Sequence, residues 1–319
     1  MKKLVSVISI LLLPLSMFSQ RSGISSPPDF EKYKELNDKE TKLAEFKDNN
    51  ETLRMKLLQI DVINKSRKRY RASPVKLDIL ASRVANRMCM EAAKNNYISH
   101  WNLAGEKPYQ RYAFAGGYDH VSENVYGEWT SGSYDISFEG IAKMMTSGHK
   151  SFMSERAPND GHKKNIIDKT HNFVGIGFFA SETQFRYNEE FIDRYLEFEN
   201  IPSVLKINET GSITIKTDGS EFPYYLIIYR EKFPVQLNVA QLKKTGSYQD
   251  YTNEEYMKLL AWELAAYRYG NSYTIPLKFN REGLYYIHIY LDKMEIKNPS
   301  ALNTKGKTEG SGIVIRVEK

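Results

Sequence analysis

Residues 161–167 of this chain read Gly-His-Lys-Lys-Asn-Ile-Ile, and residues 173–179 read Phe-Val-Gly-Ile-Gly-Phe-Phe. The second stretch is short and apolar, so it predicts a strand soon after the histidine segment. Two earlier stretches, Ser99-His100 and Ser122-Glu123-Asn124, add a second imidazole and a carboxylate. Imidazoles and carboxylates that converge in one cleft can bind a divalent ion or move protons.

Together with Phe152-Met153-Ser154-Glu155, these stretches resemble the CAP superfamily in its bacterial form. This is the group of cysteine-rich secretory proteins, antigen 5 and plant pathogenesis-related 1 proteins. The resemblance covers about residues 53–198. It implies an α/β/α sandwich whose cleft holds the histidine of Gly-His, here His162, and the glutamate before asparagine, here Glu123. It implies no particular reaction, because members share a fold more than an activity.

The chain departs from the family pattern at two places. Ser122 stands where the family usually has glycine, which would change the local turn without removing the carboxylate. The family's Trp-x-x-Glu is replaced by the stretch that ends in Glu155, close to the histidine. Glu128 and Glu139 are therefore alternatives for the second carboxylate.

The candidate metal ligands are His100 and His162, and the candidate catalytic carboxylates are Glu123 and Glu155. This set suits Zn²⁺ better than calcium, because calcium prefers six to eight oxygen ligands and gains little from imidazole. Two histidines leave positions open for water or a substrate group. We expect the two rings within about 7 Å of each other, as shared ligation at roughly 2.0–2.1 Å per Zn–N bond requires.

The other candidate side chains receive structural or no roles. His149 is predicted to lie in the core, and no function is assigned to the remaining histidines, which are His120, His171 and His288. Cys89 lies between two methionines in a predicted helix, which favours a buried small side chain over a nucleophile. The sequence has no Gly-x-Ser-x-Gly elbow, no His-Glu-x-x-His helix and no glycine-rich phosphate loop.

The first twenty residues pair Lys2 and Lys3 with the apolar run 4–17, which predicts a cleaved secretory signal over residues 1–19. That run is too short to span a bilayer, and no later segment offers about twenty apolar residues, so we expect no stable membrane anchor. Cleavage would leave 43 basic and 39 acidic residues, a formal charge of +4. So mild an excess does not indicate a nucleic-acid partner. A single cysteine excludes an internal disulfide.

Apolar spacing predicts two helices before the first histidine, at about residues 53–67 and 77–92. A helix over 136–147, capped by Asp135, and a strand over 194–198 follow. After Pro202 the pattern changes to short alternating strands. The predicted elements there are strands at 204–207, 212–216, 224–229, 235–239, 273–279, 284–291 and 312–317, with one helix at 254–267 capped by Asn253.

We therefore predict an α+β fold in two domains. A signal peptide at 1–19 and a polar, loosely ordered leader at 20–50, with one short helix around 29–47, precede a CAP-type α/β/α sandwich at 51–200. A β-sandwich-like domain with one inserted helix follows at 201–319. We place the boundary between Phe198 and Val204 and expect the two halves to fold separately.

Two functional hypotheses follow, with a structural alternative. The first is an exported bacterial binding module, secreted or periplasmic, whose cleft recognises an extracellular or envelope ligand with or without a zinc ion. The second is a hydrolase in which metal-activated water attacks a peptide or ester bond while Glu123 or Glu155 moves the proton. The third treats the four residues as a hydrogen-bond network without a ligand. The sequence leaves open whether the protein is an enzyme, which ligand it takes and its oligomeric state.

Overall fold

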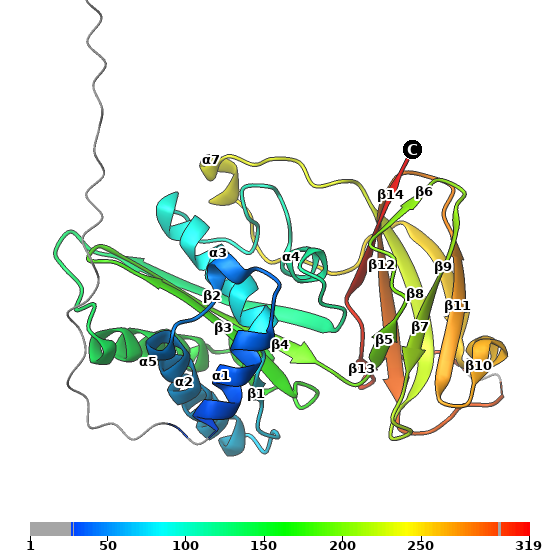
Figure 1. The fold of residues 1–319 in the computed structure, drawn as a ribbon, viewed down its shortest axis with the longest axis horizontal. Helices are drawn as coiled ribbons and strands as arrows, with labels where there is room; N and C mark the ends of the chain where they lie inside the picture. The colour runs from blue at the N-terminus through cyan, green and yellow to red at the C-terminus, as the bar shows by residue number, and fades with distance from the viewer. Residues whose placement is uncertain (1–26, 28, 299–300) are drawn as a thin grey trace, which may run out of the picture.

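The computed structural model describes residues 27, 29–298 and 301–319. The predicted signal peptide lies outside these residues. Helices and strands make up similar shares of the chain, which is the α+β class expected. Figure 1 shows a part with both helices and strands on the left and a strand-rich part on the right. Within the described ranges, no helix has the length and apolar character needed to cross a membrane.

A four-stranded sheet in the order β1-β3-β4-β2 forms the centre of the N-terminal part. β1 runs parallel to β3, and the other neighbours are antiparallel. β2 is therefore an edge strand with one side open to other groups. The four strands are β1 (Lys76–Leu77), β2 (His120–Trp129), β3 (Phe173–Ala180) and β4 (Gln184–Asp193).

The alternation of side chains along β3 decides which helices cover each face of this sheet. Val174 and Ile176 are buried with apolar residues of α2, α5 and α6, whereas Gly175 and Gly177 face α3. A Cβ added at either glycine would lie 2.4 Å from an alanine Cβ of α3, so only glycine permits this close approach. The helices are α1 (Phe30–Lys39), α2 (Asn50–Arg69), α3 (Ile79–Lys94), α4 (Pro108–Phe114), α5 (Phe138–Ser154) and α6 (Gly161–Ile167), with a 3-10 turn η1 (Ala44–Phe46).

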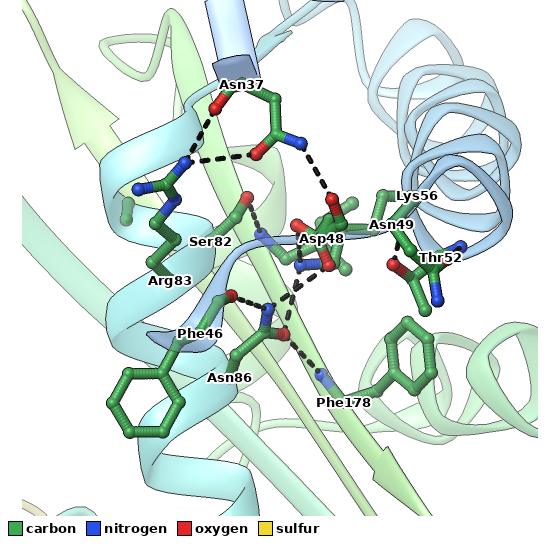
Figure 2. A network of polar contacts seen from close by, with 12 residues as sticks. Asn37, Phe46, Asp48, Asn49, Thr52, Lys56, Ser82, Arg83, Asn86 and Phe178 are labelled. Atoms are coloured by element: carbon green, nitrogen blue, oxygen red, sulfur yellow. Dashed lines mark hydrogen bonds and ion pairs between the residues drawn. The ribbon is translucent and has the colours of Figure 1, made fainter. Parts of the chain in front are cut away.

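Residues 30–50 pack against α2 and α3, so the expectation of loose order is wrong for this segment, whereas the short helix expected around 29–47 is α1 (Figure 2). Lys56 and Asp48 form a buried ion pair of 2.7 Å. Asn86 on α3 donates to Asp48 Oδ1, and Arg83 donates to the carbonyl oxygen of Asn37. Phe30 and Tyr33 of α1 are also buried in one hydrophobic cluster with residues of α2, so the attachment combines polar and apolar contacts.

The C-terminal part consists of two sheets, ordered β10-β11-β7-β5 and β6-β14-β12-β8-β9, with β13 paired to β12. Buried side chains from both sheets share one hydrophobic cluster. The strands are β5 (Glu197–Glu199), β6 (Val204–Lys206), β7 (Thr210–Lys216), β8 (Phe222–Glu231), β9 (Glu255–Leu260), β10 (Arg268–Tyr269), β11 (Ser272–Lys278), β12 (Gly283–Asp292), β13 (Thr308–Glu309) and β14 (Ile313–Glu318).

Two predictions for this part are wrong. The segment 254–267 is not one helix: it forms β9, one turn of helix α8 (Ala261–Leu264) and a 3-10 turn η2 (Ala265–Tyr267). β9 pairs with β8, and this non-local pairing overrides a sequence pattern that also suits a helix. The expected strand at 235–239 is an irregular stretch that ends in α7 (Val239–Leu242), capped by Asn238.

Two predictions in the first domain also need correction. The strand expected at 194–198 is replaced by β4, which ends at Asp193, and by the short β5. β5 pairs with β7, so the chain joins the second set of sheets at Glu197. The cap of α5 is Ser137, which accepts from Gly140 N–H, instead of Asp135.

The two parts are joined by more than a linker. Tyr109 of α4 stacks on Tyr286 of β12 with ring centroids 4.3 Å apart, inside a cluster that draws on both parts. Residues 232–253, between β8 and β9, return to the N-terminal part, and we call them the strap. Figure 1 shows α7 of the strap, in yellow, next to α3. Leu242 of α7 is fully buried there in a cluster with Met88 and Ala92.

Candidate functional site

The candidate site lies across the edge strand β2, where alternation sends neighbouring side chains to opposite faces of the sheet. Ser122 donates from its hydroxyl to Asn165 Oδ1 of α6 at 2.6 Å, and Asn165 donates to Asn124 Oδ1. Asn124 in turn donates to the carbonyl oxygen of His162. Ser122 and Asn124 thus fix α6 against β2, and Ser122 supplies a contact that glycine could not make.

Glu123 points to the other face and anchors the first imidazole. Its Oε1 lies 2.9 Å from His100 Nδ1, and its Oε2 accepts from Arg111 Nη2 at 2.5 Å and from Asn188 at 2.9 Å. Arg111 also donates to the carbonyl oxygen of His100 at 2.6 Å. One buried guanidinium therefore positions both the carboxylate and the backbone of the histidine.

The second imidazole belongs to His162, in the first turn of α6. Its Nδ1 lies 2.5 Å from Glu155 Oε1, and its backbone N–H donates to Glu155 Oε2 at 3.0 Å. Glu155 directly follows α5, so the turn between α5 and α6 brings the carboxylate and the histidine together. The side chains of His162 and Glu155 are 31% and 25% exposed, so this half of the site is open to solvent.

The two imidazoles meet across β2, with ring centroids 6.3 Å apart. This separation lies inside the about 7 Å expected for shared zinc ligation. Both rings use Nδ1 on a carboxylate, and neither Nε2 has a hydrogen bond to a described residue. A carboxylate on one nitrogen orients a histidine for metal binding through the other, so the donor set fits a zinc ion.

Glu123 has a carboxyl neighbour that the sequence did not reveal. Glu190 on β4 is its register partner, and both side chains are buried. Burial alone would raise the pKa of Glu123, but the charge of Arg111 and the hydrogen bond from His100 hold that pKa below its usual range. Burial raises the pKa of Glu190 well above its usual range, and the charge of Glu123 adds to this effect. The pKa values of the two neighbouring carboxyl groups are therefore pushed apart, downward for Glu123 and upward for Glu190.

The strap forms a wall of the site next to His100. Tyr248 accepts a hydrogen bond from the backbone N–H of Glu123 at 2.9 Å, and its ring lies 5.0 Å from the His100 ring. Thr245 Oγ1 lies 2.7 Å from Ser99 Oγ. His100 is only 15% exposed as a result, so a ligand has freer access from the His162 side.

The remaining candidates lie outside this site. Glu128 accepts from Tyr126, and Glu139 lies in the first turn of α5. His149 is buried between Glu189 and Ser66 in the core, as expected. Cys89 is buried too, and burial raises its thiol pKa well above the usual value, which removes it as a nucleophile.

Sequence reasoning missed Glu190 and Tyr248. Recognising β4 as a strand would have placed Glu190 on the Glu123 face, but charged residues on both faces of β4 hide its alternation. Tyr248 has no local signal, because its partner is 125 residues away.

Comparisons with known proteins bear on the N-terminal part. A family model described as the cysteine-rich secretory protein family (CAP) matches residues 60–191. The comparison with curated protein sequences gives no match.

Three solved structures show limited likeness. An extracellular protein containing an SCP domain from Bacillus anthracis str. Ames is 20% identical, with 43% of this chain and 39% of that chain covered and a TM-score of 0.33. An outer surface protein from Borrelia burgdorferi is 18% identical, with 44% and 92% covered and a TM-score of 0.34. A chitin binding domain from Burkholderia pseudomallei is 8% identical, with 37% and 57% covered and a TM-score of 0.22. The chain thus spans well under two thirds of the first of these proteins.

Proposed function

Because residues 60–191 are a domain of the CAP family, we propose that the chain is an exported protein whose cleft between His100 and His162 binds an extracellular ligand. The predicted signal segment motivates export, to the periplasm or out of the cell. The ligand would carry an oxygen donor, such as a carboxylate or carbonyl, that can share a metal ion with the two imidazoles.

One observation carries this proposal: each imidazole holds its Nδ1 on its own carboxylate, and the two rings lie 6.3 Å apart. A purely structural histidine would normally use both nitrogens, as His149 does with Glu189 and Ser66. The contrast supports a role for the two Nε2 atoms toward a metal ion or ligand. A bound zinc ion would polarise a ligand oxygen and lower the pKa of a bound water.

The buried carboxyl pair favours hydrolysis as the second candidate function. The pKa of Glu123 is lowered and that of Glu190 is raised, and two carboxyl groups with pKa values pushed apart are what general acid and base chemistry uses. In this reading Glu123 or the more exposed Glu155 accepts a proton from the attacking water.

Zinc titration of the full-length exported chain by calorimetry tests the binding proposal. His162→Ala should abolish zinc binding in the cleft, and Glu155→Gln should weaken it by about 10–100-fold, since it removes the group that orients the ring. Glu128→Gln is the matched control, because this carboxylate contacts neither imidazole. Equal zinc affinity of the Glu155 and Glu128 variants would contradict the metal-binding role.

A panel of peptide and ester substrates separates the two functions. If the protein is a hydrolase, Glu123→Gln should reduce turnover by about 10²–10⁴-fold, whereas Glu128→Gln should not. If the wild type binds zinc in the cleft but shows no turnover, the binding-module hypothesis is supported and the hydrolase hypothesis is rejected. If the wild type shows neither zinc binding in the cleft nor turnover, only the hypothesis of a structural hydrogen-bond network remains.

A further inference from the structure

A second group of metal-ligating side chains lies at the junction of the two parts. His120 begins β2 of the N-terminal sheet, Glu309 lies on β13, and Asp250 belongs to the strap. One ligand atom from each of these residues lies within 4.8 Å of the other two. Three segments that are distant in sequence thus present an imidazole and two carboxylates to one point.

The separation between two members of the group fits two ligands of one small cation. His120 Nδ1 and Glu309 Oε1 are 3.4 Å apart, too poorly aligned for a hydrogen bond. Two ligands at about 2.0–2.1 Å from a tetrahedral zinc ion lie roughly 3.3–3.4 Å from each other. The pair is therefore spaced as ligands of a shared ion would be.

The charges of the group also call for a cation. His120 Nδ1 is buried and has no hydrogen-bond partner among the residues that the structure describes. Within those same residues, neither Asp250 nor Glu309 forms an ion pair with lysine or arginine, and the ion-pair partners of Glu309 are both histidines. The carboxylate of Glu123 differs, because Arg111 supplies it with a fixed positive charge. A buried donor atom and two carboxylates without a fixed positive charge are satisfied together by a divalent ion.

His288 on β12 contacts two members of this group. Its Nδ1 contacts Glu309 Oε1, and its Nε2 lies 2.7 Å from the carbonyl oxygen of Asp250. It is 1% exposed and lies edge-on to the ring of Tyr286, with centroids 4.0 Å apart. A partner that contacts the ligating residues and orients them is typical of metal centres.

We propose that His120, Asp250 and Glu309 form a second divalent-metal site of the zinc type, built between the two parts of the chain and separate from the cleft. Imidazole with two carboxylates suits a first-row ion such as zinc or manganese, whereas calcium prefers a larger, all-oxygen shell. Three protein ligands leave a position for water, as in open zinc sites.

The test starts from a variant that lacks the two candidate zinc ligands of the cleft. Full-length protein with His100→Ala and His162→Ala is freed of metal and titrated with ZnCl₂, and in parallel with MnCl₂. We expect this variant to keep one zinc ion per chain by elemental analysis, and Asp250→Asn in the same background to weaken binding by at least about 100-fold. The double alanine variant binding no zinc or manganese would overturn the proposal, as would unchanged affinity after Asp250→Asn.

Two further measurements guard against misfolding. Circular dichroism in chelator compares the fold of each variant, and Glu309→Gln offers a second substitution of equal size if Asp250→Asn does not fold. Anomalous diffraction at the zinc edge then locates the ion in the double alanine variant. An ion bonded to His120 Nδ1 supports the site, and an ion bound anywhere else overturns it.

Discussion

The candidate site around His100 and His162, called the cleft, and the group of His120, Asp250 and Glu309, called the junction, both pair histidines with carboxylates. They differ in how the carboxylate charges are compensated. In the cleft, Arg111 lies 2.5 Å from Glu123 and supplies a fixed positive charge. At the junction, Asp250 and Glu309 face His120 with no lysine or arginine paired to them among the described residues. Glu123 therefore has a fixed counter-charge without an ion, whereas Asp250 and Glu309 have none among the described residues. We expect metal removal to destabilise the junction and to leave the cleft folded.

The largest effect should come from removing the fixed charge of the cleft. Arg111→Met leaves Glu123 and Glu190 buried without their cation, so the free energy of unfolding should fall by about 3–5 kcal/mol. Urea unfolding measures this loss. Arg316→Met, at an arginine paired with the exposed Glu318, is the control and should change stability by less than about 0.5 kcal/mol. Similar values for the two variants would mean that the cleft does not depend on Arg111.

The two sites should respond to different supporting residues. Glu155→Gln should lower zinc affinity by about 10–100-fold in the cleft and leave the junction unchanged, and His288→Gln should do the reverse. Calorimetry in backgrounds that keep only one of the sites measures each affinity. Loss of both affinities through either single variant would show that the sites are not separate.

The carboxyl pair of the cleft predicts an unusual pH dependence. The Glu190 pKa is raised in the folded protein, so above about pH 4.3 the unfolded chain releases a proton that the folded protein retains. The contribution of Glu190 to stability is therefore lost as pH rises toward its folded-state pKa. Glu190→Gln should gain stability relative to wild type between pH 4.5 and 7, by at most about 1.4 kcal/mol per pH unit. Urea unfolding at both pH values is the measurement, with the exposed Glu182→Gln expected to show no such trend.

The smallest effect should come from the strap. Tyr248→Phe removes the acceptor of the Glu123 backbone N–H, so it should cost about 1 kcal/mol of unfolding free energy. Tyr251→Phe, on the exposed end of the strap, is the matched control. Hydrogen exchange at the Glu123 amide should quicken in the first variant alone, and unchanged exchange would show that the strap does not protect the cleft.

The sequence predicted the parts of the cleft that rest on local motifs. His162 and Glu155 are seven residues apart, and one turn between two helices brings them together. His100 and Glu123 could be paired because their flanking residues resemble a known family. The two faces of β3 can also be told apart from the sequence. The alternation of Val174 and Gly175 indicates one face that packs apolar side chains and one face that a helix approaches closely.

The parts that sequence reasoning missed depend on distant or polar contacts. The leader attaches in part through the ion pair of Lys56 and Asp48, and buried charges leave no apolar periodicity in the sequence. The strap has neither a strand nor a long helix, and its contacts with Ser99 and Glu123 span more than 120 residues. The junction draws His120, Asp250 and Glu309 from three separate segments, so no spacing in the sequence could join them.

The strap also bears on the order in which the molecule is assembled. Thr245 meets Ser99 over 146 residues of chain, so this contact must wait until most of the protein has been synthesised. We expect a chain that emerges from its N-terminus to complete the first sheet and its helical layers while the strap is still missing. During that interval His100 has no Tyr248 beside it, and the cleft lacks one wall. We therefore expect the geometry of the candidate site to be acquired last, and a chain that ends prematurely to fold its scaffold without the finished site.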